Sequence, residues 1–123
     1  MILWMIFISY LSHKTSDELP KNPPFIVQVI KGYTGQYFDK VGHFGLYFIL
    51  GLLSLKPFLE QKVRVSSFCI LFGLIDETHQ YFIPSRHFDL LDWMADIAGV
   101  CTAFTIIYCL EKNNYFRKPT FRS

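Results

Sequence analysis

Apolar residues gather into four long runs along the chain, and each run has a length that suits a helix. The runs cover residues 1–12, 38–55, 63–83 and 90–110. At about 1.5 Å per residue, the last three come close to or exceed the ~30 Å hydrocarbon core of a bilayer, whereas the first reaches only about 17 Å. The pattern predicts an all-α integral membrane bundle of about four transmembrane helices, the first one short.

A cleavable signal peptide is the alternative for the first run. Such a peptide begins with basic residues and ends at a small-x-small cleavage site. Residues 1–12 have neither feature, so we expect a short membrane helix. Together the four runs form one membrane domain over residues 1–111, followed by a basic cytoplasmic tail over residues 112–123.

The connections between the runs are rich in residues that interrupt helices. Between Ser12 and Tyr37 we expect a loop, because acids, prolines and glycines recur there. Within it, residues 25–30 are apolar, and the pattern fits either an interfacial half-turn or a strand. Pro84, Ser85 and Arg86 predict a tight turn between the last two runs.

Composition and charge restrict the partners. The chain is 51% apolar and 18% aromatic, with a net charge of +2, which favours membrane lipids as partners and gives no indication of a nucleic-acid partner. The three cysteines lie inside apolar runs without paired spacing, so we expect neither a disulfide framework nor a metal site from them: Cys69, Cys101 and Cys109.

Lysine and arginine residues near the ends of the runs predict the orientation. With four spans, seven of them fall on the side of the two termini and five on the other. This modest bias favours both termini in the cytoplasm, so that the polar ends of the last three runs meet at the outer face. The seven are Lys56, Lys62, Arg64, Lys112, Arg117, Lys118 and Arg122.

Ionisable residues recur at helical spacing at that same end. Asp39 and His43 are four residues apart, as are Asp92 and Asp96, while Glu77 and Gln80 are three apart, so each pair shares one helix face. Ionisable groups at membrane depth usually face a bundle interior or a wet cavity. We therefore predict an externally facing polar pocket formed by Asp39, Lys40, His43, Glu77, Gln80, Arg86, Asp92 and Asp96.

A structural interpretation competes with the functional one. Polar side chains can hold a membrane bundle together through interhelical hydrogen bonds, and small residues allow close helix packing. Ala95, Gly99 and Ala103 recur every fourth residue, and Gly42 and Gly45 are expected to act likewise. We favour a functional pocket because the number of ionisable groups exceeds what packing requires.

The chemistry of the pocket is left open, including whether the protein is an enzyme. His43, His79, Glu77, Asp92 and Asp96 are chemically suited to a metal, but without an H-x-x-x-H or H-E-x-x-H spacing we expect no metal and no cofactor. Glu77 or Asp96 beside His43 fits a general base, and Arg86 with Lys40 fits a phosphate site. The sequence contains no nucleophile elbow and no glycine-rich phosphate loop. A proton- or ion-coupled carrier is a third hypothesis for the function, but no internal repeat supports it.

These residues resemble the VanZ-like family, which is named for a protein linked to teicoplanin resistance. The family pattern is Asp-Lys-x-x-His, then Glu-x-x-Gln, then Pro-x-Arg and a helix with Asp-x-x-x-Asn-x-x-Gly. The matching positions lie between residues 38 and 110, and Ile8 to Ser12 also resemble the family's first helix. They are Asp39, Lys40, His43, Glu77, Gln80, Pro84, Arg86, Asp92 and Gly99.

Two positions depart from the family pattern. Asp96 replaces the usual asparagine, and Ser85 replaces a common glycine. The resemblance implies a multi-pass protein of the bacterial cytoplasmic membrane with an envelope-related role. Our first hypothesis is therefore that the pocket binds or processes a lipid-linked or glycopeptide-like envelope ligand, with a part in teicoplanin tolerance. Neither a reaction nor an oligomeric state follows from the sequence.

Overall fold

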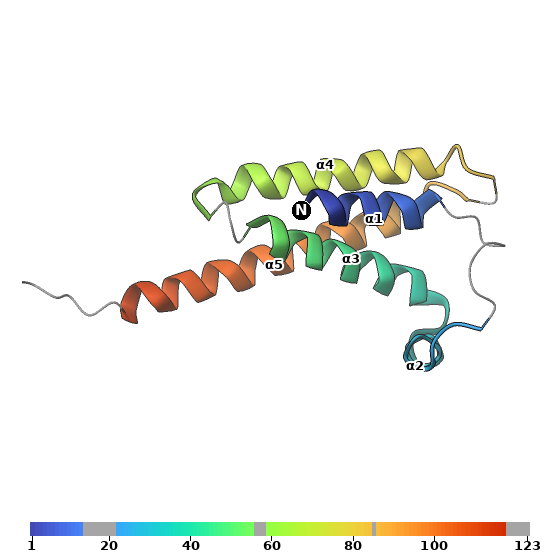
Figure 1. The fold of residues 1–123 in the computed structure, drawn as a ribbon, viewed down its shortest axis with the longest axis horizontal. Helices are drawn as coiled ribbons and strands as arrows, with labels where there is room; N and C mark the ends of the chain where they lie inside the picture. The colour runs from blue at the N-terminus through green and yellow to red at the C-terminus, as the bar shows by residue number, and fades with distance from the viewer. Residues whose placement is uncertain (14–21, 56–58, 85, 118–123) are drawn as a thin grey trace, which may run out of the picture.

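The computed structural model describes residues 1–13, 22–55, 59–84 and 86–117, and this part of the chain is helical. Four helices run along the long axis of the molecule, and α2 projects from one end (Figure 1). The all-α prediction is therefore confirmed. The helices are α1 (Ile2–His13), α2 (Phe25–Thr34), α3 (Phe38–Leu55), α4 (Lys62–Gln80) and α5 (Leu90–Arg117), with 3-10 turns η2 (Gly35–Tyr37) and η3 (Leu59–Gln61).

Small residues let α3 and α5 form the most extensive interface between helices. A Cβ atom added at Gly99 would lie 2.5 Å from the carbonyl oxygen of Phe44, and one added at Gly51 would lie 2.7 Å from Cβ of Ala103. Both separations are below van der Waals contact. The predicted small-residue packing is thus confirmed at Gly99 and Ala103, with Gly51 as the partner on α3.

The expectation that Gly42 and Gly45 also pack closely is wrong. An added Cβ at either position meets nothing within 4 Å. These two residues lie near the start of α3, where Gly42 lines the hollow that holds the polar residues. The close approach of α5 is to the backbone of Phe44 and Phe48 on α3, and Gly42 and Gly45 do not face it.

Two tryptophans tie the outer helices to the α3–α5 pair. The Trp4 indole of α1 donates a 3.0 Å hydrogen bond to the carbonyl of Leu46, and the Trp93 indole of α5 donates a 3.2 Å bond to the carbonyl of Ile70. A buried apolar cluster fills the space between the four helices, and it comprises Ile8, Tyr47, Leu50, Cys69 and Val100.

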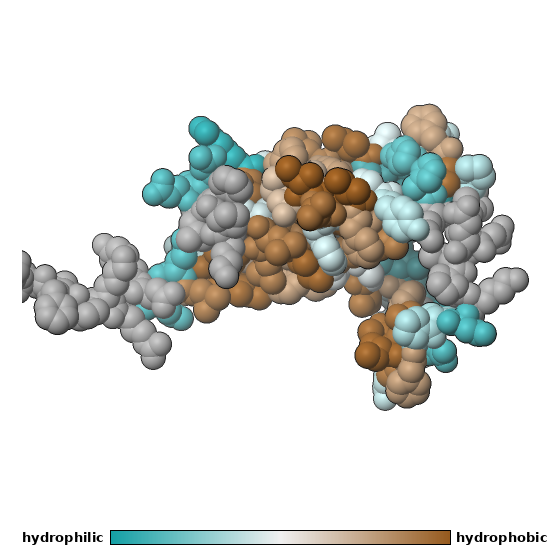
Figure 2. All heavy atoms as spheres, in the orientation of Figure 1, coloured by the Kyte–Doolittle hydropathy of each residue, from teal (hydrophilic) through white to brown (hydrophobic). Residues whose placement is uncertain are grey.

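Two stretches have the length and apolar composition of membrane spans: residues 25–55 (α2, η2 and α3) and residues 90–113 of α5. The apolar helix α1 is shorter, as predicted. The helix α4 is long enough to be a span but not apolar enough, because Arg64, Asp76 and Glu77 interrupt its apolar residues. On the face in Figure 2, hydrophobic side chains cover the middle of the bundle and hydrophilic ones gather near its ends. This distribution suits a lipid environment.

The predicted loop between Ser12 and Tyr37 is wrong for residues 25–34, which form α2. Its apolar residues recur with helical period, and neither the half-turn nor the strand is formed. Gly35, with φ of 54°, ends the helix in a conformation that glycine adopts readily. The exposed residues of α2 include Phe25, Ile26, Val29, Ile30 and Tyr33.

The last two helices differ from the predicted runs at their ends. α4 stops at Gln80 instead of residue 83, and a turn follows over residues 81–84. α5 continues to Arg117, well past residue 110, so the first part of the expected tail is helical. Ser85 and residues 118–123 lie outside the described residues.

Candidate functional site

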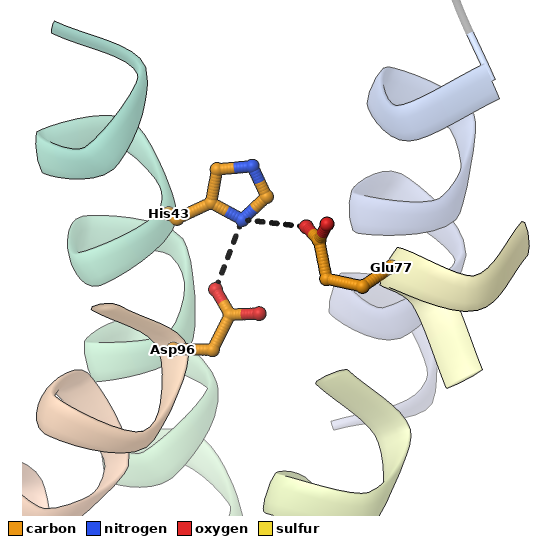
Figure 3. A group of neighbouring side chains, drawn as sticks. All are labelled: His43, Glu77 and Asp96. Carbon is orange, nitrogen blue, oxygen red and sulfur yellow. Dashed lines mark hydrogen bonds and ion pairs between the residues drawn. The ribbon is translucent and has the colours of Figure 1, made fainter. Parts of the chain in front are cut away.

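His43 lies between two buried carboxylates that come from different helices (Figure 3). Its Nδ1 atom is 3.0 Å from Oδ1 of Asp96 on α5 and 3.5 Å from Oε1 of Glu77 on α4. Both acids are 0% exposed. The other ring nitrogen, Nε2, faces Oδ2 of Asp92 at 3.9 Å. The imidazole is thus surrounded by acids from two helices.

Lys40, one helical turn before His43, binds two acids at the start of α5. Its Nζ atom lies 2.7 Å from Oδ2 of Asp89 and 2.7 Å from Oδ1 of Asp92. The hydrogen bond from Lys40 holds the pKa of Asp89 below its ordinary value. Because two carboxylates already neutralise this ammonium, the suggested phosphate site formed by Arg86 with Lys40 loses one of its two cations.

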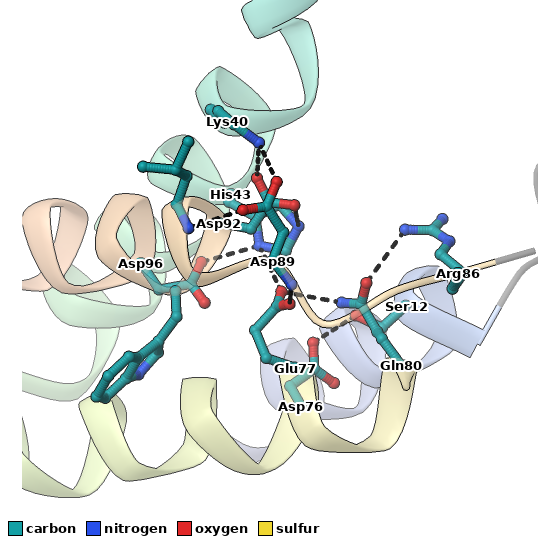
Figure 4. A network of polar contacts seen from close by, with 12 residues as sticks. Ser12, Lys40, His43, Asp76, Glu77, Gln80, Arg86, Asp89, Asp92 and Asp96 are labelled. Atoms are coloured by element: carbon teal, nitrogen blue, oxygen red, sulfur yellow. Dashed lines mark hydrogen bonds and ion pairs between the residues drawn. The ribbon is translucent and has the colours of Figure 1, made fainter. Parts of the chain in front are cut away.

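A chain of hydrogen bonds continues from Glu77 toward the turn after α4 (Figure 4). The Gln80 amide donates to Oε1 of Glu77 at 3.3 Å, and Nη1 of Arg86 donates to Oε1 of Gln80 at 3.4 Å. The backbone N–H of Asp89 points to Oε2 of Glu77 at 3.5 Å. The end of α4 is therefore connected to both the turn and the start of α5.

Two contacts involve residues that were not among the predicted site residues. The Ser12 hydroxyl of α1 donates a 2.5 Å hydrogen bond to Oδ2 of Asp76, which is 4% exposed. Asp89 bridges Lys40 and Glu77. Asp76 is four residues from Gln80, and Asp89 is three residues from Asp92, so helical spacing could have identified both acids as site residues. Nothing in the sequence around Ser12 could have identified this serine.

A hollow of about 510 Å³ opens beside these residues. Asp39 is exposed and lies on its wall, and His87, which lies in the loop before α5, also contributes. The wall comprises Ile8, Leu11, Ser12, Phe38, Asp39, Gly42, His43, Leu46, Tyr47, Gln80, Arg86, His87, Asp89 and Asp92. A second hollow, of about 600 Å³, lies between η3 and α5, away from the acid cluster.

The structure places seven of the eight predicted site residues in one network of direct polar contacts, and the eighth, Asp39, lines the same hollow. His79 is excluded from the cluster. It is exposed, and its ring stacks on that of His13 with centroids 5.7 Å apart. The cluster can hold a proton, a cation or a ligand with several polar groups.

Comparison with known proteins identifies the family of this chain. The model of the VanZ/LLP1 family matches residues 1–111, which include all of the polar cluster. No match was found among the curated proteins or the solved structures. Because the family model covers most of the chain, this helical protein with two candidate membrane spans belongs to the VanZ/LLP1 family.

Proposed function

We propose that the hollow between α1, α3, α4 and α5 binds a lipid-linked or glycopeptide-like ligand of the cell envelope, and that the protein thereby contributes to teicoplanin tolerance. The observation that carries this proposal is the hollow itself. Its volume of about 510 Å³ falls in the range of roughly 300–1,000 Å³ typical of ligand sites. Packing alone does not require such a space.

The wall of the hollow combines the two kinds of surface that such a ligand needs. Ile8, Leu11 and Leu46 supply apolar contacts on one side. Asp39, Arg86 and other polar residues supply hydrogen bonds on the other side. The wall carries the acids Asp39, Asp89 and Asp92 as well as Arg86, a combination that suits ligand hydroxyl and amide groups, which both donate and accept hydrogen bonds.

Helix α2 supports access from the membrane. It lies at the end of the bundle that holds the polar cluster, and its apolar residues are exposed while Gln28 and Lys31 occupy the opposite face. Such a helix lies in the bilayer interface with its apolar side toward the acyl chains. An envelope lipid would then reach the hollow along the membrane surface.

The orientation of the protein can be tested with reporters. With both termini in the cytoplasm, a reporter fused after Ser123 is expected to report cytoplasm, and one inserted near Asn22 is expected to report the outside. The physical reason is the excess of Lys and Arg on the side of the termini. The reverse pattern in both fusions would place the hollow in the cytoplasm and contradict an envelope ligand.

A structural role is the second candidate, and specific contacts favour it. The bond from Ser12 to Asp76 joins α1 to α4, and Lys40 joins α3 to Asp89 and Asp92. Interhelical bonds of this kind hold membrane bundles together. Arg86 and Asp39 line the hollow, so the two roles can be separated by substituting them.

Ligand capture tests the proposed function. A benzophenone amino acid replacing His87, on the wall of the hollow, is expected to form an adduct with a lipid-linked envelope precursor when cells are illuminated. The same amino acid replacing Tyr108, which lines the second hollow, is the matched control. Mass spectrometry of the purified protein identifies the adduct. No adduct at position 87, or equal amounts of adduct at both positions, would contradict the proposal.

A further inference from the structure

The innermost acids of the cluster have too little positive charge near them. Asp76, Glu77 and Asp96 are each at most 4% exposed. Among the described residues, the basic group that contacts Glu77 and Asp96 directly is the single imidazole of His43. Burying a carboxylate without a compensating charge is costly. Either a bound proton or a further cation can compensate for such burial.

The geometry points to a divalent transition-metal ion bound by His43, Glu77 and Asp96. One donor atom from each residue lies within 4.8 Å of the other two. Nδ1 of His43 is 3.0 Å and 3.5 Å from the two carboxylate oxygens, and ligands bonded at about 2.0–2.2 Å to one ion stand at similar separations. The inference rests on the polar site proposed above and not on the identity of its envelope ligand.

A second observation supports a ligand at this point. Oδ2 of Asp96 is buried and has no hydrogen-bond partner among the described residues. In Figure 3 this oxygen points to the side on which Glu77 lies. Buried polar atoms in native proteins normally have a partner. A cation held between the two carboxylates would supply one, because Asp96 can present either oxygen or both to it.

The imidazole is also oriented for this task. Metal-binding histidines usually direct their other ring nitrogen toward a carboxylate or carbonyl, which fixes the tautomer. Nε2 of His43 faces Asp92 at 3.9 Å, which is longer than a hydrogen bond, and Lys40 in turn holds Asp92. A proton on Nε2 leaves the lone pair of Nδ1 available between Glu77 and Asp96.

The donor set indicates the class of ion. One imidazole nitrogen with two carboxylate oxygens suits Zn²⁺ or Mn²⁺, and the two carboxylates balance the charge of a divalent ion. Three protein ligands are typical of sites that keep an open position for water or a ligand. His43 lines the hollow, so that position would face the proposed envelope ligand. The sequence argued against a metal although these three residues are chemically suited to one, because they come from three helices and form no local ligand motif.

Zinc titration of the purified, chelator-stripped protein in detergent tests the inference. Calorimetry is expected to show about one saturable equivalent, with affinity falling roughly tenfold or more in His43→Gln, Glu77→Gln and Asp96→Asn, since each removes a ligand. The matched controls are His79→Gln and Glu111→Gln, which lie outside the cluster and should bind as the unaltered protein does. No saturable binding, or unchanged affinity in the three variants, would overturn the inference.

X-ray absorption of the zinc-loaded unaltered protein keeps the test valid if a variant fails to fold. We expect one imidazole nitrogen and otherwise oxygen around the ion. Sulfur ligands or several imidazoles would place the ion at the cysteines or at His13 and His79, and would overturn the assignment. Photoadducts at position 87 without zinc binding would reject this inference and support the proposed function. Zinc binding without photoadducts would support this inference and reject the proposed function.

Discussion

Gly99→Ala is expected to destabilise the protein strongly, although replacing a helical glycine by alanine normally stabilises a helix by about 0.5–1 kcal/mol. The added Cβ would lie 2.5 Å from the carbonyl oxygen of Phe44 and 2.8 Å from the backbone nitrogen of Phe48. Both neighbours are backbone atoms of α3, so relief requires the two helices to separate. Overpacking of this kind typically costs about 1–3 kcal/mol and occasionally more.

Gly45→Ala is the matched control, because it makes the same change in the partner helix. An added Cβ at Gly45 meets nothing within 4 Å, so this variant should be as stable as the unaltered protein or slightly more stable. Thermal unfolding in detergent, followed by circular dichroism, measures both. Equal unfolding temperatures for the two variants would mean that α3 and α5 do not approach each other at Gly99 as described.

Arg86→Lys is expected to abolish most of the proposed contribution to teicoplanin tolerance while leaving the fold intact. The substitution keeps the positive charge but removes the planar guanidinium, which presents donors in a fixed fork. Arg86 lines the hollow, and its hydrogen bond to Gln80 is long, at 3.4 Å. Losing one charge-assisted hydrogen bond to a ligand costs about 1.5–3 kcal/mol, or roughly ten- to a hundredfold in affinity.

Arg64→Lys provides the control for this substitution. Arg64 is exposed near the start of α4 and lines the second hollow, at the other end of the helix. The same chemical change there should alter neither stability nor tolerance. Loss of tolerance in both variants would indicate an effect that does not depend on where the guanidinium lies, which would contradict a specific role for Arg86.

The sequence predicted the four bundle helices and most of the polar cluster because helical spacing is a local property. Glu77 and Gln80, or Asp92 and Asp96, share a face whatever surrounds them. Their meeting could be anticipated because short connections bring the same ends of successive spans together. The pairing within the cluster could not be anticipated, since it depends on how the helices are rotated about their axes.

Other features could not be predicted from the sequence, for physical reasons. The helix α2 was hidden by the prolines before it and the glycines within and after it, which signal a loop when they are taken one by one. Gly51, and not Gly42 or Gly45, contacts α5 closely, because the crossing point of two helices is a tertiary property. The sequence suggested Glu77 or Asp96 as the acid beside His43 and could not decide between them, whereas in the structure His43 contacts both, at 3.5 Å and 3.0 Å.

The most direct test of the functional pocket is a paired measurement on Arg86→Lys, with Gly99→Ala measured beside it. The unfolding temperature of the purified protein and the teicoplanin tolerance of cells carrying it are determined for each variant. We predict that Arg86→Lys loses tolerance at an unchanged unfolding temperature, whereas Gly99→Ala loses both together. If Arg86→Lys keeps full tolerance, or loses it only in step with stability as Gly99→Ala does, the polar residues serve the bundle alone and the functional pocket is contradicted.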